Sequence, residues 1–237
     1  MNTAVAHSLS PEAVLNPEFK SANRRQTSLL APLERVCLNW LAGNMPLWVK
    51  PDHLTLLGFA AMLIAGASYA CAKWSPVAAL LVVNLCLALN WFGDSLDGTL
   101  ARARNKQRPR YGFYVDHIID AFGIMFTICG LALSGLMSWN IALGVLVIYF
   151  MLSIDVYLAT YTIGTFRISF YKFSPTELRI LLAIGNLRAM SHPTTRVLGD
   201  KYLFFDIGAL VAIGLMAVVL VVSVTRNTLT LYRAEKV

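Results

Sequence analysis

Long apolar runs dominate the pattern of hydrophobic and polar positions along this chain. A helix that crosses a bilayer needs about 20 consecutive apolar residues. Segments that reach or approach this length run over 53–73, 76–103, 112–136, 138–165, 175–191 and 202–227. The fifth is the weakest, because it is short and carries the polar residues Glu177, Arg179, Asn186 and Arg188, which are costly in lipid. The pattern predicts an all-α integral membrane protein with six transmembrane helices.

A shorter amphipathic stretch precedes the first of these segments. Its apolar residues recur at helical spacing, at Leu29, Leu30, Leu33, Val36, Cys37, Trp40 and Leu41, with Glu34, Arg35 and Asn39 on the other side. The stretch stops near Gly43 and is too short to span a bilayer. We therefore expect an N-terminal helix that lies in the membrane interface. A soluble helix packed on a partner is the alternative.

Two regions follow from this pattern. Residues 1–26 form a polar N-terminal segment without the apolar core of a signal peptide. Residues 27–237 form one membrane-embedded domain, which agrees with a composition of 57% hydrophobic and 14% charged residues. The four cysteines form no CxxC pattern, so neither a zinc site nor a disulfide framework is indicated.

Basic residues mark one side of the predicted membrane. They precede the first span, fill the second and fourth connections and follow the last span, whereas the third connection has none. By the positive-inside rule both termini are cytoplasmic, although Arg196 and Lys201 in the fifth connection fit less well. The net charge of +7 then indicates contact with anionic lipid, and no nucleic-acid partner is expected. The residues that carry the pattern are Lys20, Arg24, Arg25, Arg35, Lys50, Arg102, Arg104, Lys106, Arg108, Arg110, Arg167, Lys172, Arg226, Arg233 and Lys236.

Four aspartates lie at the cytoplasmic ends of two neighbouring spans. Asp94 and Asp97 are three residues apart and Asp116 and Asp120 four apart, so each pair shares one face of a helix. Two such faces would repel each other strongly unless cations lay between them. Carboxylates without cysteine or several histidines select a hard cation such as Mg²⁺, Mn²⁺ or Ca²⁺. A metal site is therefore the leading interpretation of this chain.

The residues around these acids suggest a phosphate substrate. Gly98 and Gly112 leave room for a ligand close to the helix backbone, and Arg102 is a permanently charged, forked phosphate ligand. A metal at this place could bridge a diphosphate, and one carboxylate could take the proton from an attacking hydroxyl.

The stretch from Asp94 to Asp120 resembles the signature of the CDP-alcohol phosphotransferases, D-x2-D-G-x2-A-R-x8-G-x3-D-x3-D. Every fixed position matches, and the gap over residues 103–111 is one residue longer than in the family. A loop between helices absorbs one extra residue easily. The matching residues are Asp94, Asp97, Gly98, Ala101, Arg102, Gly112, Asp116 and Asp120.

The resemblance implies a role for each of these residues. Two Mg²⁺ or Mn²⁺ ions would be held by Asp94, Asp97 and Asp116 with help from Asp120, which would also be the base. The residues that would line the cytidine diphosphate pocket are Gly98, Ala101, Arg102 and Gly112. Lys50 to Thr55 resembles the P-N-x-[LI]-T segment of the family, so Asp52, which stands where Asn is usual, and Thr55 would contact the nucleotide.

The function that we expect is phospholipid synthesis at the cytoplasmic face of a membrane. A phosphatidyl group passes from CDP-diacylglycerol to a small polar alcohol, and CMP leaves. The alternative is transfer from CDP-choline or CDP-ethanolamine to diacylglycerol, with Glu177 as base. A cation transporter is a remote alternative from another class, because its acids would lie near the midplane. We also expect a homodimer, surrounded by membrane lipid.

Three further features have two readings each. Asp155, inside the fourth span, either binds the acceptor or pairs with Arg179 or Arg188. His117 is either a substrate contact or an interfacial histidine. The polar residues Arg167, Lys172, Glu177, Arg179 and Arg188 either form the acceptor pocket or mark the membrane boundary.

Overall fold

A computed structural model describes residues 31–163 and 175–235. The predicted polar segment 1–26 and the basic residues Arg167 and Lys172 lie outside the described residues. The elements are α1 (Ala31–Asn44), α2 (Pro51–Cys71), α3 (Pro76–Ala103), α4 (Pro109–Leu133), α5 (Trp139–Ile163), α6 (Pro175–Ser191), β1 (Thr194–Val197), β2 (Asp200–Leu203) and α7 (Phe204–Ala234).

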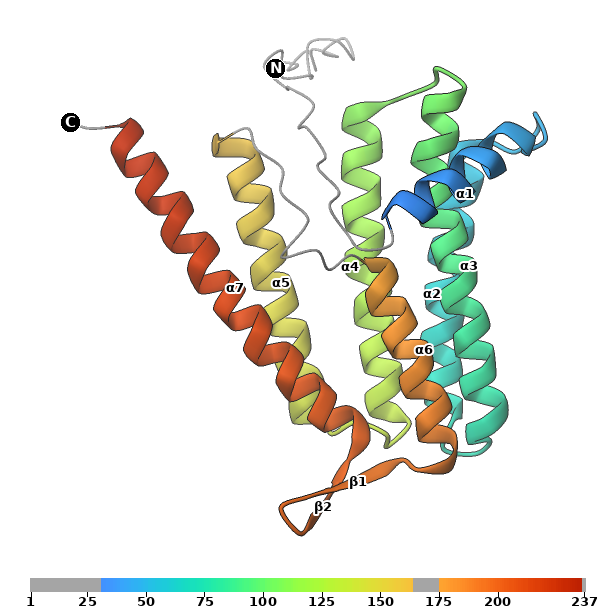
Figure 1. Cartoon of the computed structure of the whole chain (residues 1–237), viewed down its shortest axis with the longest axis vertical. Coiled ribbons are helices and arrows are strands. Elements are labelled where there is room, and N and C mark those ends of the chain that lie inside the picture. The colour runs from blue at the N-terminus through green and yellow to red at the C-terminus, as the bar shows by residue number, and fades with distance from the viewer. Residues whose placement is uncertain (1–30, 164–174, 236–237) are drawn as a thin grey trace, which may run out of the picture.

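The long helices run side by side, and α1 crosses them at one end (Figure 1). Helix α2 packs against both α3 and α4, while α3 also contacts α1 and α6. Helices α5 and α7 form a pair, in which α5 contacts α4 and the start of α7 contacts α6 near Gly185. The connection between α3 and α4 lies at the end of the bundle opposite the β1–β2 hairpin (Figure 1). The buried core consists mainly of apolar residues of α2, α3 and α4.

Among the described residues, five helices are long and apolar enough to cross a membrane: α2, α3, α4, α5 and α7. Helix α6, the weakest predicted span, has 17 residues and packs beside α3. The all-α integral membrane fold is thus confirmed, and the number of six spans stays a prediction. Prolines occupy the first turns of α2, α3 and α4, where their missing N–H group costs no helical hydrogen bond.

A two-stranded antiparallel hairpin, β1–β2, is the one described departure from the helical expectation. Its strands pair from Thr194 with Leu203 to Val197 with Asp200. The two turn residues Leu198 and Gly199 both have positive φ, 53° and 99°. Tight hairpin turns of this kind are usually marked in a sequence by Asn-Gly or Asp-Gly. Leu-Gly does not give that signal, so the sequence pattern did not predict the hairpin.

Helix α1 buries the face that carries Glu34 and exposes its apolar stripe. Leu33, Val36 and Trp40 are 66–71% exposed, whereas Glu34 is only 8% exposed. Leu38 and Ala42, which share the face of Glu34, are buried as well. The sequence pattern places Glu34 opposite the apolar residues, and the structure keeps this grouping with the Glu34 side packed against the rest of the protein. The reason is that the protein interior offers hydrogen-bond donors to the carboxylate, and the apolar residues face outward.

Glycines bring the backbones of the central helices into direct contact. A Cβ atom added to Gly130 of α4 would lie 2.0 Å from the carbonyl oxygen of Gly66 in α2. A Cβ atom on Gly93 of α3 would lie 2.5 Å from the carbonyl oxygen of Leu54 in α2. Neither neighbour is a flexible side-chain end, so a larger residue could be fitted only if the helices moved apart. Helix α2 thus sets the distance to both of its neighbours.

Replacing Gly130 with Ala is expected to destabilise the protein by about 1–3 kcal/mol, the usual cost of overpacking a dense interior. The measurement is thermal denaturation of the purified protein in detergent. Gly208→Ala in α7 is the matched control, since a Cβ atom there meets nothing within 4 Å in the part of the chain that the structure describes. Equal thermal stability of the Gly130→Ala variant and the wild type would show that the contact with Gly66 is not tight.

Candidate active site

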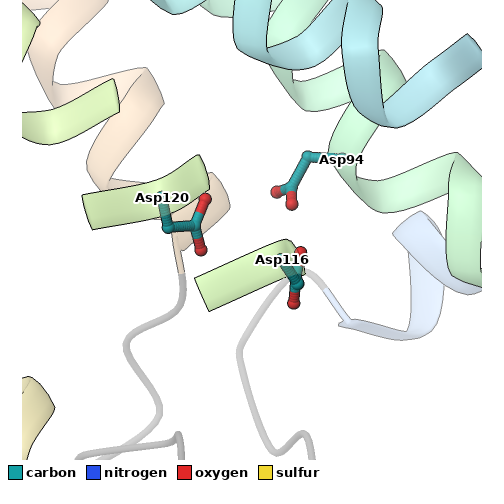
Figure 2. A group of neighbouring side chains, drawn as sticks. All are labelled: Asp94, Asp116 and Asp120. Atoms are coloured by element: carbon teal, nitrogen blue, oxygen red, sulfur yellow. The ribbon is translucent and has the colours of Figure 1, made fainter. Parts of the chain in front are cut away.

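Three carboxylates from two helices converge beside α2. Asp94 of α3 and Asp116 and Asp120 of α4 each offer an oxygen, and these oxygens all lie within 4.8 Å of one another. Figure 2 shows Asp94 facing the two aspartates of α4 across the space between the helices. Asp116 and Asp120 are one helical turn apart, which places both on the same side of α4. Acids so close together fit a hard divalent cation, which would offset their mutual repulsion.

A small pocket contains these acids. Helix α2 contributes Thr55, Gly58 and Phe59 to its wall, α3 contributes Asn90, Asp94 and Asp97, and α4 contributes Asp116, Ile119 and Asp120. Because α2 packs against both α3 and α4, it closes one side of the gap between the two acidic helices. The absence of a side chain at Gly58 lets α3 come close at this level, since a Cβ atom there would lie 3.4 Å from the amide nitrogen of Asp94.

Asp97 lines the same pocket but is held separately. Its Oδ2 accepts a hydrogen bond from the Thr55 hydroxyl at 2.5 Å, and its Oδ1 accepts one from the backbone N–H of Gly98 at 2.5 Å. It is not among the three acids whose oxygens converge. Thr55 therefore positions a motif aspartate, and its predicted contact with the nucleotide stays a prediction.

Arg179 of α6 reaches across to the acidic site. Its Nη2 donates to Oδ2 of Asp94 at 2.5 Å, and its Nε donates to Oδ1 of Asn90 at 2.8 Å. Asn90 in turn donates to the carbonyl oxygen of Gly58 at 3.1 Å. The Arg179 side chain is only 14% exposed, so this ion pair is shielded from solvent. The arginine orients Asp94 and compensates part of the negative charge of the site.

Asp155 does not pair with either arginine proposed for it. Its carboxylate accepts hydrogen bonds from Ser223 at 2.5 Å and from Asn227 at 3.4 Å, both on α7. Arg188 instead donates to the carbonyl oxygen of His192 at 2.9 Å. The ion-pair reading of Asp155 is therefore wrong, because the residue faces α7 and Arg179 is engaged by Asp94. Its alternative role, acceptor binding, stays a prediction.

The other motif residues lie on the last turns of α3 and the first turn of α4, and their predicted contact with cytidine diphosphate stays a prediction. Arg102 is exposed, and its Nη2 donates to the Thr99 hydroxyl at 3.0 Å. Among the described residues, a Cβ atom added to Gly98 would lie 3.4 Å from the Arg102 guanidinium, and one added to Gly112 would meet nothing within 4 Å. Ala101 is half-buried on the same turn of α3. These positions leave room for a ligand.

Asp52 lies outside the acidic pocket. It is exposed and forms an ion pair with Arg108, and it is not among the residues that line the acidic pocket. Arg108 also lies over the Tyr111 ring, 4.2 Å from its centroid. The acidic pocket therefore does not test the predicted contact between Asp52 and a nucleotide, which stays a prediction.

An aromatic cluster adjoins the acids of α4. The His117 ring lies 4.2 Å from that of Phe113 and 5.1 Å from that of Tyr157, measured between centroids. Nδ1 of His117 lies 2.6 Å from the carbonyl oxygen of Phe113. Tyr157 belongs to α5, so this cluster connects the acidic helix to the α5–α7 pair. Sequence reasoning missed both Tyr157 and Asn90. Of the two, only Asn90 offered a signal, because it lies one helical turn before Asp94.

The sequence is similar to those of several known proteins. The archaetidylinositol phosphate synthase of Pyrococcus horikoshii is 30% identical over 122 residues, which cover 52% of this chain and 59% of that protein. Cholinephosphotransferase 1 of Homo sapiens is 28% identical over 193 residues, which cover 76% of this chain and 46% of that protein. Cholinephosphotransferase 1 of Xenopus laevis is 29% identical over 121 residues, 47% of this chain and 30% of that protein. The chain thus spans less than two thirds of the length of these relatives.

A family model extends the similarity over most of the chain. The model for CDP-alcohol phosphatidyltransferase matches residues 48–222, a range that runs from the turn before α2 into α7. This range contains all four aspartates and their partners Thr55, Asn90 and Arg179. The resemblance first noted in the signature around Asp94 is therefore confirmed, and the chain belongs to the CDP-alcohol phosphatidyltransferase family.

Proposed function

We propose that this protein is a metal-dependent enzyme of phospholipid synthesis that transfers a phosphatidyl group from CDP-diacylglycerol to a small polar alcohol. The observation that carries the proposal is the convergence of Asp94, Asp116 and Asp120 at the pocket between α3 and α4. Family membership supports the CDP-linked donor. The archaetidylinositol phosphate synthase among the relatives supports a polar alcohol as acceptor.

The residues present fit one or two Mg²⁺ or Mn²⁺ ions. Asp94, Asp116 and Asp120 would hold them, with Asp97 at the edge of the same pocket. Bound there, the metal would supply positive charge to the diphosphate and to its leaving oxygen. Arg102 is exposed beside Gly98 and would bind a phosphate oxygen through its forked donors.

Asp120 is the best placed base among the clustered acids, because it is the exposed one of the three. Its carboxylate would take the proton of the acceptor hydroxyl while that oxygen forms a bond to the phosphorus distal to cytidine. The bond from this phosphorus to the oxygen of CMP breaks, and CMP leaves with the electron pair. Asp120 then returns the proton to solvent, and the new phospholipid remains in the membrane.

The alternative reaction transfers a phosphoalcohol from CDP-choline or CDP-ethanolamine to diacylglycerol. The observation that favours it is the match of human cholinephosphotransferase 1 over 76% of this chain. The transporter alternative has no comparable support, since the family match concerns transferases.

The experiment that separates the two reactions measures CMP release by the purified protein in Mg²⁺. One set of reactions contains CDP-diacylglycerol with a panel of polar alcohols, and the other contains CDP-choline or CDP-ethanolamine with diacylglycerol. Release of CMP in the first set alone is the expected result. Release in the second set alone would establish the alternative, and release in neither would overturn the proposed function.

We also propose that the acidic site faces the cytoplasm, that α1 lies in the membrane interface, that α6 is a sixth span and that residues 27–237 act as one domain. The basic residues of the α3–α4 connection, at the same end of α3 and α4 as the acids, support this orientation. The exposed apolar residues Leu33, Val36 and Trp40 would give α1 its contact with lipid. The homodimer stays a prediction, which the mass of the protein in lipid nanodiscs would test.

A cysteine at Lys106, in the α3–α4 connection, is expected to react with an impermeant thiol reagent only from the cytoplasmic side. A cysteine at Leu198, the fully exposed tip of the hairpin, should react only from the other side. The native cysteines are replaced first, because Cys37 and Cys71 are exposed. Labelling of both positions from the opposite sides would place the acidic site on the non-cytoplasmic face, where cytoplasmic nucleotide could not reach it.

A further inference from the structure

A buried glutamate connects three helices next to the acidic site. Glu34 of α1 is 8% exposed, and its Oε1 accepts hydrogen bonds from three donors. These are Nε1 of Trp91 at 2.9 Å, the hydroxyl of Ser95 at 3.2 Å and the hydroxyl of Thr176 at 2.9 Å. Burial of a carboxylate is costly, so three donors on one oxygen are the compensation that such a group requires.

The other carboxylate oxygen of Glu34 is buried too. Within residues 31–163 and 175–235, Oε2 has no hydrogen-bond partner. An apolar residue at this place would avoid that cost and could still pack between the helices. Packing of α1 against its neighbours therefore does not explain why this residue is an acid. The explanation must lie in the hydrogen bonds that Glu34 accepts from α3 and α6.

The partners of Glu34 are placed on both sides of the Asp94–Arg179 ion pair. On α3, Trp91 and Ser95 flank Asp94 in the sequence. On α6, Thr176 lies one helical turn before Arg179, whose guanidinium binds Asp94 and Asn90. The first turn of α1 lies beside the start of α6 (Figure 1), and the Glu34–Thr176 hydrogen bond joins them. Glu34 therefore holds together the two segments between which the ion pair forms.

We propose that Glu34 is a positioning residue for the metal site. By joining α3 to the first turn of α6, it holds Arg179 against one oxygen of Asp94 and so orients the carboxylate toward Asp116 and Asp120. The inference rests on the proposed function, because it assumes that these acids bind a divalent cation. It assigns to α1 a part in the geometry of the site, although α1 contributes no residue to the pocket.

The test is Mn²⁺ binding to the purified protein without nucleotide, followed by electron paramagnetic resonance. Glu34→Ala is expected to weaken Mn²⁺ affinity about 10-fold, the lower end of the loss when a metal ligand loses its partner, because Glu34 acts on Asp94 through Arg179. Glu34→Gln is expected to retain most of the affinity, because its amide oxygen can still accept from Trp91, Ser95 and Thr176. Equal Mn²⁺ affinity of Glu34→Ala and the wild type would overturn the proposal, as would a Gln variant as weak as the Ala variant.

Leu38→Ala is the matched control, since Leu38 is buried on the same face of α1 one turn later. It should lower thermal stability and leave Mn²⁺ affinity near that of the wild type. A loss of Mn²⁺ affinity as large as in Glu34→Ala would show that any weakening of the packing of α1 lowers the affinity. That result would contradict a specific role of Glu34.

A second variant keeps the proposal testable if Glu34→Ala does not fold. Thr176→Val removes the donor on α6 and preserves the shape of the side chain, so Mn²⁺ affinity should fall several-fold. Unchanged affinity in this variant would overturn the link through α6. If the wild type binds no Mn²⁺, the proposed metal site is wrong. If the wild type binds Mn²⁺ and the variants bind it equally well, only the inference about Glu34 is wrong.

Discussion

Asp116→Asn is expected to lower CMP release by about 100-fold or more, since even an outer partner of a metal ligand can be worth that much. The Asp116 carboxylate has an oxygen within 4.8 Å of oxygens of both Asp94 and Asp120, so the substitution removes a charged oxygen from the cluster. Asn keeps the shape of the side chain, which separates loss of charge from loss of packing. The measurement is CMP release together with Mn²⁺ binding.

Asp200→Asn serves as the control, because this acid is exposed in the hairpin at the opposite end of the molecule. It should show wild-type CMP release. A fully active Asp116→Asn variant would contradict the metal site, and so would wild-type activity that a chelator does not diminish.

Asp120→Asn is expected to reduce kcat by about 100-fold or more, in the range of a lost general base. Affinity for the CDP-linked substrate should survive better in this variant than in Asp97→Asn. Asp97 is fixed by the Thr55 hydroxyl and by the Gly98 N–H, beside the motif residues that would bind the diphosphate. A change there disturbs substrate binding, whereas a change of base mainly disturbs proton transfer. Nucleotide affinity and turnover are measured in both variants.

Two results would revise the assignment. If Asp120→Asn loses nucleotide affinity as severely as Asp97→Asn, Asp120 acts as a metal ligand and has no separate role as base. If Asp120→Asn keeps near-normal turnover, the base lies elsewhere. Glu177 would then be the next residue to substitute, and the reaction with diacylglycerol as acceptor would gain support.

The common depth of Asp94, Asp116 and Asp120 could be predicted because two simple regularities combine, whereas the convergence of their oxygens comes from the structure. Helical spacing puts each pair of acids on one face, and alternating membrane crossings bring both pairs to the same depth. The place of Arg179 could not be predicted in this way. It lies 85 residues from Asp94 in the sequence, and spacing says nothing about contacts between distant helices.

The orientation of α1 could not be read from its amphipathic pattern either. Such a pattern shows which residues share a face, but it does not say what each face meets. In a soluble protein the apolar face of a helix turns inward, whereas here Leu33, Val36 and Trp40 point outward and Glu34 points inward. The donors that make this favourable come from Trp91, Ser95 and Thr176 on other helices.

The glycine contacts along α2 have a consequence for how the site can change. Gly93 immediately precedes Asp94, and a Cβ atom at Gly93 would collide with the backbone of α2 at Leu54 and Gly58. A single methyl group at this position would act as a wedge, driving α3 away from α2 and carrying Asp94 with it. The position of a charged carboxylate thus depends on an uncharged neighbour that packs directly against another helix. A search for variants with altered metal preference should therefore sample Gly93, Gly66 and Gly130 as well as the aspartates.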